Sequence, residues 1–358
     1  MLRQLRRLTG RVEAAGPNAC AIAVYADVTA RTFPATDLGY EGVACLDDAA
    51  RAAILLCDVW QATAATSVKA WAAGLLDFVH HMQLDDGRFV NFVTDWAGTR
   101  NTTGPTSFPG GGFWHARGVR ALAKAWLTFD DDRSRDGLRR GLAFVRTEID
   151  VPPDVRSLHA MTAIDVLRAG RMADLRADLE RWCDEIAAQR HGDVLRDNPD
   201  EEEPHLWGHV QEGVLADAGT LLERADLVAI ARRSALSYLA PLIQSGFDAP
   251  TVQPYGVASA IYSVDRLAAV TGEPVFTELA AQARAWFDGR NPARRPVYDR
   301  QEGWVHDGVD DGVLNPHSGA ESNVVAAQAL LEDVVLLVES AERTVSATLR
   351  SDARLPSS

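Results

Sequence analysis

Two adjacent aspartates and an arginine stand at the start of an apolar segment in the stretch YEGVACLDDAAR, residues 40–51. Carboxylates in the first turn of a helix are favoured by the positive end of the helix dipole, so Asp47 and Asp48 can simply cap a helix. With Arg51 one turn later, the same groups can also transfer protons or bind the hydroxyl groups of a ligand. Because comparable groups recur at the starts of other apolar segments, we predict that they meet in one functional site.

Aromatic, histidine and acidic residues begin several further apolar segments, among them GGGFWHARGVRALAKAW, HLWGHVQEGVLADAGTLL, YGVASAIYSVDRLAAV and HSGAESNVVAAQALLEDVV. In the second of these, His209 and Glu212 are three residues apart and share a helix face. That pair can be a buried polar contact or part of a site, and HxxE alone supplies too few ligands for zinc. The candidate binding residues at these starts are Trp114, His115, Trp207, His209, Tyr255 and His317, and the candidate catalytic acids are Glu212 and Glu321.

Two polar loops carry the remaining candidates. In QLDDGRFVNFVTDW, residues 83–96, the Asp-Gly pair indicates a turn, and Asp86 and Arg88 can stabilise that turn or bind sugar hydroxyls. The loop VYDRQEGWVHDGVDDGVLNPHSGAES, residues 297–322, leads into the segment that carries Glu321. Long ordered loops are often functional. The candidate binding residues in this loop are Trp304, His306 and Asn315.

Apolar patterns with a period of 3.6 residues continue along almost the whole chain and predict an all-α protein. Segments that are apolar around most of their circumference are expected to be buried, and the amphipathic segments between them are expected to cover them. Six buried helices enclosed by six outer ones form an (α/α)6 toroid, in which the candidate residues share one rim. The helices are expected near residues 2–15, 42–64, 66–82, 113–128, 133–148, 153–169, 171–189, 207–222, 224–243, 254–271, 274–288 and 319–346.

Short extended segments are expected between the helices, in AIAVYADV, in GRFVNFVTDW and in PVYDRQEGWVHDGV, where Gly303 indicates a hairpin turn. We predict that these short β-hairpins lie on the rim that holds the site. The toroid is expected to form a single domain over residues 1–346, followed by a disordered tail at residues 347–358.

Charge, hydropathy and cysteine usage restrict the partners and the compartment. The formal net charge of −14 repels phosphate backbones, which argues against nucleic acid and anionic membranes as partners. No segment has the roughly 18 apolar residues of a membrane-spanning helix. The widely spaced Cys20, Cys45, Cys57 and Cys183 predict reduced thiols, the last three buried, and a cytoplasmic protein. No metal or other cofactor is expected, and the sequence leaves the oligomeric state open.

Three stretches resemble motifs of the six-hairpin glycosidase-like superfamily: the helix start LDDAAR, the hairpin DDGRFVNF and the late segment GWVHDGVDDGVLNPHSGAES. The resemblance spans residues 40–331 and is closest to bacterial proteins of this superfamily. It implies an (α/α)6 barrel with a carbohydrate cleft on the rim. The sequence departs from the superfamily pattern in GGGFWHAR, which keeps His115 and Arg117 but has Gly112 and Phe113 where an acidic pair is expected.

Glycoside hydrolysis needs one carboxylic acid to protonate the leaving oxygen and one carboxylate to activate water or attack carbon. Hydrolases of this superfamily mostly invert, so the resemblance implies an inverting glycoside hydrolase that acts on an oligosaccharide or a glycoside. We assign Asp48 as the base and either Glu212 or Glu321 as the acid.

Two other functions fit the same residues. The departure in GGGFWHAR allows a glycan-binding protein without catalysis. Histidine and tyrosine commonly remove carbon-bound protons, which suits a glycan lyase or a sugar epimerase. The residues available for that chemistry are His115, His209, His317 and Tyr255.

Overall fold

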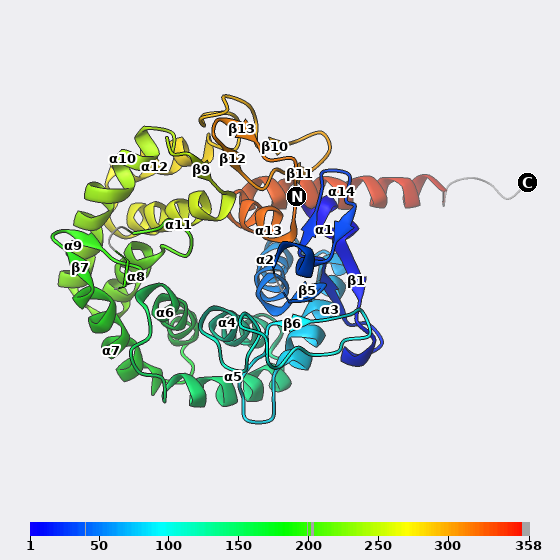
Figure 1. Ribbon diagram of the computed structural model, residues 1–358, viewed down its shortest axis with the longest axis horizontal. Coiled ribbons are helices and arrows are strands. Elements are labelled where there is room, and N and C mark those ends of the chain that lie inside the picture. The colour runs from blue at the N-terminus through cyan, green and yellow to red at the C-terminus, as the bar shows by residue number, and fades with distance from the viewer. Residues whose placement is uncertain (40, 199, 202–203, 353–358) are drawn as a thin grey trace, which may run out of the picture.

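The computed structural model describes residues 1–39, 41–198, 200–201 and 204–352. Six of its helices form an inner ring, in which each helix packs against the next and the last packs against the first (Figure 1). The inner helices are α2 (Leu46–Thr63), α4 (Gly112–Phe129), α6 (Pro153–Arg168), α8 (Gln211–Leu222), α11 (Pro254–Thr271) and α13 (Ala320–Ala329). The predicted (α/α)6 toroid is confirmed.

Each inner helix is followed along the chain by an outer helix that packs against it (Figure 1). The outer helices are α3 (Thr66–Met82), α5 (Asp132–Val145), α7 (Leu175–Ala188), α9 (Ala225–Ser234) with α10 (Ala240–Gln244), α12 (Pro274–Arg284) and α14 (Leu331–Asp352). A short helix at the other end of the chain, α1 (Leu2–Leu8), packs against α13. The buried and covering segments alternate as the sequence predicts.

Local sequence signals explain several of the helix ends. Helices α6, α11 and α12 have a proline in their first turn, where the missing amide hydrogen is not needed. Asp131 caps α5 because its carboxylate accepts hydrogen bonds from two backbone amides of the first turn. Gly272 ends α11 in the left-handed conformation, at φ 67°.

Several predicted helices are shorter than expected, and two are divided. The first helix ends at Leu8 because the chain then enters a strand, and α8 begins at Gln211 because the residues before it form a loop. The predicted helix at 224–243 contains a π-helical turn at Ala235–Leu239. Pro241 follows this turn and has no amide hydrogen to donate to the preceding turn, which explains the interruption.

The predicted helix at 319–346 turns at Leu330. The part before the turn closes the inner ring as α13, and the part after it belongs to the outer layer as α14. Because α14 continues to Asp352, the beginning of the predicted disordered tail at 347–358 is helical. The remainder of that tail, residues 353–358, lies outside the described residues.

The strands are two or three residues long and pair antiparallel. The pairs are β1 (Thr9–Arg11) with β2 (Cys20–Ile22), β3 (Tyr25–Ala26) with β4 (Thr32–Phe33), β5 (Ala44–Cys45) with β6 (Phe92–Val93), β7 (Arg190–His191) with β8 (Val194–Leu195), β10 (Tyr298–Asp299) with β11 (Trp304–Val305), and β12 (Val309–Asp310) with both β9 (Thr251–Val252) and β13 (Val313–Leu314). The hairpin predicted at Gly303 is the β10–β11 pair. The β5–β6 pair fixes the start of α2, because the amide of Leu46 donates to the backbone oxygen of Asn91 at 2.6 Å.

The cysteines agree with the expected thiols. Cys45, Cys57 and Cys183 are buried, as predicted, and these three and the half-buried Cys20 are free. Within the described part of the chain, no helix combines the length and the apolar character needed to cross a membrane.

Candidate active site

Arg51 of α2 is the centre of a carboxylate cluster at the N-terminal ends of the inner helices. Its guanidinium nitrogens lie 2.9 Å from Asp48 Oδ1 and 3.1 Å from Asp47 Oδ2 on the same helix, and 2.5 Å from Glu321 Oε1 at the start of α13. Arg117 of α4 also pairs with Asp47. We call these five residues the Arg51 cluster, and they join three inner helices, including the first and the last of the ring.

The two adjacent aspartates are not needed to cap α2. The amide of Asp48 donates to Cys45 Sγ at 3.4 Å, and the amide of Asp47 donates to Asn91 Oδ1 at 3.2 Å. Other residues therefore satisfy these amides, and both carboxylates bind Arg51 instead. Asp47 and Asp48 are thus directed at a charged cluster.

Burial and neighbouring charges separate the pKa values of the two aspartates. Desolvation raises the pKa of Asp48 to about 7, with Arg51 opposing the shift and Glu321 and Asp47 adding to it. Desolvation also acts to raise the pKa of Asp47, but Arg117 and then Arg51 outweigh it and hold that pKa below its usual value. Near neutral pH, Asp48 is therefore partly a neutral acid while Asp47 is ionised.

A second polar group lies across the ring, in the loop before α8 and at the start of α6. His205 Nδ1 is 3.1 Å from Oδ2 of the fully buried Asp197, and His205 Nε2 is 3.8 Å from Asp154 Oδ2. Desolvation raises the pKa of Asp154 to about 7, against the hydrogen bond from the Val155 amide. The imidazole thus lies between an acidic side chain and a carboxyl group that can hold a proton near neutral pH, an arrangement suited to proton transfer.

Aromatic side chains connect these two polar groups. Trp207 stacks on His205 with the ring centroids 4.3 Å apart and the rings 5° from parallel. It also contacts Phe113 of α4 at 5.0 Å and meets Tyr255 of α11 edge-on at 6.5 Å. Arg117 lies over Phe113, 5.3 Å from its ring centre. We call the Arg51 cluster together with Phe113, Asp154, His205, Trp207 and Tyr255 the N-terminal rim.

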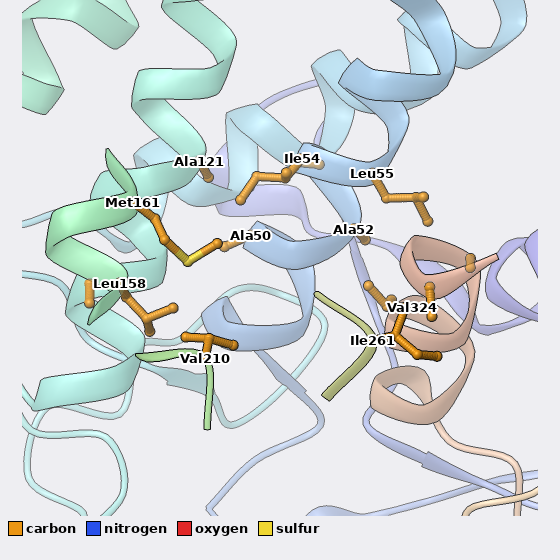
Figure 2. Packing of buried hydrophobic residues seen from close by; sticks show 14 of the residues in the cluster. Ala50, Ala52, Ile54, Leu55, Ala121, Leu158, Met161, Val210, Ile261 and Val324 are labelled. Carbon is orange, nitrogen blue, oxygen red and sulfur yellow. The ribbon is translucent and has the colours of Figure 1, made fainter. Parts of the chain in front are cut away.

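A cavity of about 440 Å³ extends from the N-terminal rim along the axis of the ring. Arg51, Arg117 and Tyr255 line it at the rim. Apolar side chains line its middle, and Figure 2 shows several of them projecting into the interior from different inner helices. These are Ile54, Leu55, Leu158, Met161, Val210, Ile261 and Val325.

Glu212 and His209 lie together but away from this cavity. Both side chains are fully buried, with His209 Nε2 2.9 Å from Glu212 Oε1, and that oxygen also accepts a 2.7 Å hydrogen bond from the Ser234 hydroxyl of α9. Desolvation acts to lower the pKa of His209, but Glu212 and Asp197 outweigh it and raise the pKa to about 10. The pair is therefore an ion pair that joins α8 to the outer layer, out of contact with solvent.

His115 is also buried, between α4 and the outer layer. Its Nδ1 accepts a 3.3 Å hydrogen bond from the Phe89 amide, and its Nε2 is 3.3 Å from the backbone oxygen of Gly141. Desolvation lowers the pKa of His115 to about 4, so the ring is neutral at neutral pH. The structure does not bring His115 to the N-terminal rim.

Three further candidates lie outside the central cavity: Asp86 and Arg88 of the first polar loop, and Trp114 of α4. Arg88 Nε donates a hydrogen bond to Asp86 Oδ2 at 2.8 Å. Hydrogen bonds from Arg88 lower the pKa of Asp86. The indole of Trp114 donates to the backbone oxygen of Phe108 at 3.0 Å. None of these side chains belongs to the described lining of the cavity.

The candidates of the late loop organise the chain that leads into α13. His306 Nδ1 lies 2.5 Å from the backbone oxygen of Asn315, and Trp304 meets the His306 ring edge-on at 4.7 Å. His317 packs beside Phe33, with ring centres 5.3 Å apart. These contacts fix the backbone immediately before Glu321.

Asp154, Asp197 and His205 are not among the site residues predicted from the sequence. Asp154 follows two prolines at the start of an apolar helix, the same pattern that pointed to Asp47 and Asp48, so a signal for it was present. Asp197 and His205 flank the acidic run NPDEEEP, whose composition alone indicates a solvated loop. Among the described residues, no group of three or more histidine, cysteine or acidic side chains could hold a metal ion.

The chain is similar to known proteins in its three-dimensional structure. A scan of protein-family models and a search of curated proteins found no match. A cellobiose 2-epimerase from Bacillus thermoamylovorans B4167 is similar with a TM-score of 0.70 at 10% identity, over 93% of this chain and 96% of that chain. A D-mannose isomerase has a TM-score of 0.68 at 10% identity, over 90% and 92% of the two chains. A family 76 glycoside hydrolase from a bovine Bacteroides thetaiotaomicron strain has a TM-score of 0.64 at 10% identity, over 92% and 75%.

Because the sequence identities are this low, the structural similarity establishes only the fold. The chain has the (α/α)6 fold of the six-hairpin glycosidase-like proteins, as its LDDAAR, DDGRFVNF and GAES stretches suggested. Function must then be argued from the residues of the N-terminal rim.

Proposed function

We propose that the protein is a carbohydrate-active enzyme whose chemistry takes place at the N-terminal rim. Its fold is shared with proteins named for reactions of sugars, namely a cellobiose 2-epimerase, a D-mannose isomerase and a family 76 glycoside hydrolase. The rim combines carboxyl groups, a histidine and aromatic side chains beside a cavity. Such a combination is suited to bind a sugar and to transfer protons to it.

The proposed reaction is hydrolysis of a glycoside, for which the resemblance to the superfamily favours inversion. The observation that carries it is that Asp48 and Glu321 share the guanidinium of Arg51 in unlike surroundings: Asp48 is 3% exposed, whereas the Glu321 side chain is 39% exposed. Two carboxyl groups whose environments push their pKa values apart supply an acid and a base. Asp48, with its pKa raised to about 7, is suited to protonate the leaving oxygen, and Glu321 to activate water.

This assignment exchanges the role that the sequence suggested for Asp48 and leaves out Glu212, whose side chain is fully buried. Trp207 is 39% exposed at the same rim and offers an aromatic face for the apolar side of a sugar ring. Phe113 and His205 hold that indole in place from two sides.

Product analysis in H₂¹⁸O tests the proposal with a panel of aryl glycosides and oligosaccharides. Hydrolysis places ¹⁸O on the anomeric carbon, and ¹H NMR of the first-formed anomer reports inversion. Asp48→Asn and Glu321→Gln should each lower kcat by about 100- to 10,000-fold, the range of acid–base catalysis. Glu302→Gln, on the exposed turn between β10 and β11, is the matched control and should leave kcat unchanged. Full activity of both rim variants in a folded protein would remove the acid–base assignment.

His205 favours a sugar epimerase or isomerase as the second candidate function. Its Nδ1 lies 3.1 Å from Asp197 Oδ2 and its Nε2 faces Asp154, so the imidazole can remove a proton from the carbon next to a sugar carbonyl. In D₂O that reaction incorporates deuterium at this carbon, whereas hydrolysis does not. Deuterium incorporation that is lost in His205→Gln would select this function over hydrolysis.

A further inference from the structure

The central cavity carries more cations than anions on its wall. Four arginines and two aspartates belong to the described lining, in a protein whose formal net charge is −14. Two of the arginines, Arg51 and Arg117, are neutralised by the carboxylates of the N-terminal rim. The other two, Arg120 and Arg266, lie further along α4 and α11 than the rim residues Arg117 and Tyr255, and we call the part of the cavity that they line the far end.

The two lining aspartates do not neutralise the arginines of the far end. Asp58 Oδ1 pairs with Lys124 Nζ at 2.5 Å. Asp265 Oδ1 accepts a 2.9 Å hydrogen bond from Arg284 Nη1. Each of these carboxylates is therefore balanced by a cation of its own.

Arg120 and Arg266 have few partners. Arg120 makes no hydrogen bond to any described residue, and its nearest carboxylate, Asp165, is 3.9 Å away. Desolvation raises the pKa of Asp165, with Arg120 and Lys124 opposing the shift. Arg266 donates to Asp217 at 2.8 Å, but Asp217 also binds Arg168 at 2.8 Å. The Nε atoms of Arg120 and Arg266 are both buried and lack a hydrogen-bond partner in the described structure.

A tyrosine completes the far end. Tyr262 lines the cavity one turn before Arg266, and both Arg120 and Arg266 act to lower the pKa of its phenol. Burial raises the pKa of Tyr262, with Asp217 and Asp165 adding to the shift, so the hydroxyl stays protonated and can donate a hydrogen bond. Two guanidinium groups and one hydroxyl donor thus face one end of an enclosed space.

We propose that the far end binds an oxyanion, a phosphate or carboxylate group, between Arg120, Tyr262 and Arg266. Planar guanidinium groups match the geometry of phosphate and carboxylate oxygens, and a narrow, partly apolar cavity strengthens their attraction. Tyr255 and Arg266 are eleven residues apart on α11, about 16 Å along the axis, and Arg120 lies one turn beyond Arg117 on α4, so the oxyanion site lies deeper in the cavity than the N-terminal rim. Its occupant is either a free anion or the anionic end of a ligand that passes through the apolar middle.

Titration calorimetry of the full chain at low ionic strength tests the proposal with inorganic phosphate, glucose 6-phosphate and glucuronate. Arg120→Gln and Arg266→Gln should each weaken anion binding by roughly tenfold to a hundredfold, the range for hydrogen bonds to charged groups. The matched control is Arg233→Gln on the outer surface, where Arg233 pairs with Asp193, and it should bind as the wild type does. Equal affinity for phosphate and glucose 6-phosphate identifies a free oxyanion as the occupant, and tighter binding of the anionic sugars identifies a sugar that carries the charge.

Tyr262→Phe keeps the ring in place and removes only the donor, so it reports on the far end if an arginine variant does not fold. It should weaken binding of the same anions without changing the midpoint of thermal unfolding by more than a few degrees. The proposal is overturned if none of the three anions binds the wild type, or if the folded variants bind them as tightly as the wild type. Because these measurements need no turnover, their failure is separate from a failure of the proposed hydrolysis.

Discussion

Replacing Asp48 by asparagine is expected to change how stability depends on pH. Asp48 has a pKa of about 7 in the folded protein, against about 3.9 for an aspartate in an unfolded chain. Between these two values the folded state binds more protons than the unfolded state, so the free energy of unfolding of the wild type falls as pH rises. Asp48→Asn has no proton to lose at this position, so its free energy of unfolding should lack the part of the decrease that Asp48 causes.

The size of the effect follows from the pKa difference. About three pKa units at about 1.36 kcal/mol each give about 4 kcal/mol, and the charged hydrogen bond to Arg51 that the asparagine lacks adds only an offset that does not vary with pH. An unfolding entropy of about 2.1 cal/mol/K per residue gives about 0.75 kcal/mol/K for the 358-residue chain. Relative to the wild type, the melting midpoint of Asp48→Asn should therefore rise by about 5 °C between about pH 4 and about pH 7.5.

Thermal unfolding followed by circular dichroism at constant ionic strength, in half-unit steps of pH, measures this difference. Asp193→Asn is the control, because the Asp193 side chain is 57% exposed and pairs with Arg233 on the surface. Its midpoint should follow that of the wild type at every pH. A constant difference between Asp48→Asn and the wild type across this range would show that Asp48 does not titrate there, and its assignment as the proton donor would fall with it.

Two further substitutions separate structural from functional residues. Glu212→Gln should lower the free energy of unfolding by about 3 kcal/mol, because the buried His209 imidazolium loses the nearer of its two carboxylate partners, while the kcat of the folded protein stays within about twofold of the wild type. A large loss of kcat without loss of stability would return Glu212 to the catalytic set. Trp207→Ala should raise KM for glycosides by about tenfold, since the exposed indole is the proposed platform for the sugar. An unchanged KM would place the sugar elsewhere.

The ring of helices was predictable because the evidence for it is repeated along the chain. Each inner helix has an apolar circumference that only burial can explain, and each is followed by an amphipathic segment that can cover it. The closing step was harder to predict, since the segment at 319–346 shows one continuous helical pattern and gives no sign of the turn at Leu330. The chain turns there because the last inner helix must be covered by an outer helix. That requirement comes from the packing of the whole ring.

The candidate site was predictable only where the helix end itself pointed to the axis. Asp47, Asp48 and Glu321 met at the rim, whereas Glu212 faces the outer layer. The sequence contained one indication that Glu212 faces the outer layer. Gly219 is seven residues from Glu212 and so shares its helix face. A Cβ atom at Gly219 would come within 2.7 Å of Val228 Cγ2 in α9, so that face must pack closely against the outer helix.

The loop before α8 could not be placed from its sequence. The helical pattern predicts a helix from residue 207, but Gly208 adopts φ 75°, which favours glycine, and the chain stays irregular up to Gln211. This path brings His205 and Trp207 over Asp154 and Phe113, residues of two other inner helices. Contacts of this kind depend on how distant segments fit together, which no local pattern records.

The Arg51 cluster links the closure of the ring to the proposed chemistry. Arg51 and Glu321 are 270 residues apart, and their ion pair joins the first inner helix to the last. The helix hairpins are local structures, but the pairing of Asp48 with Glu321 through one guanidinium exists only when the whole ring is closed. Opening of the α2–α13 contact would separate the proposed acid from the proposed base while leaving the individual hairpins in place. The residues that close the fold are therefore the same residues that create the unequal pair of carboxyl groups, and a change to Arg51 must affect both.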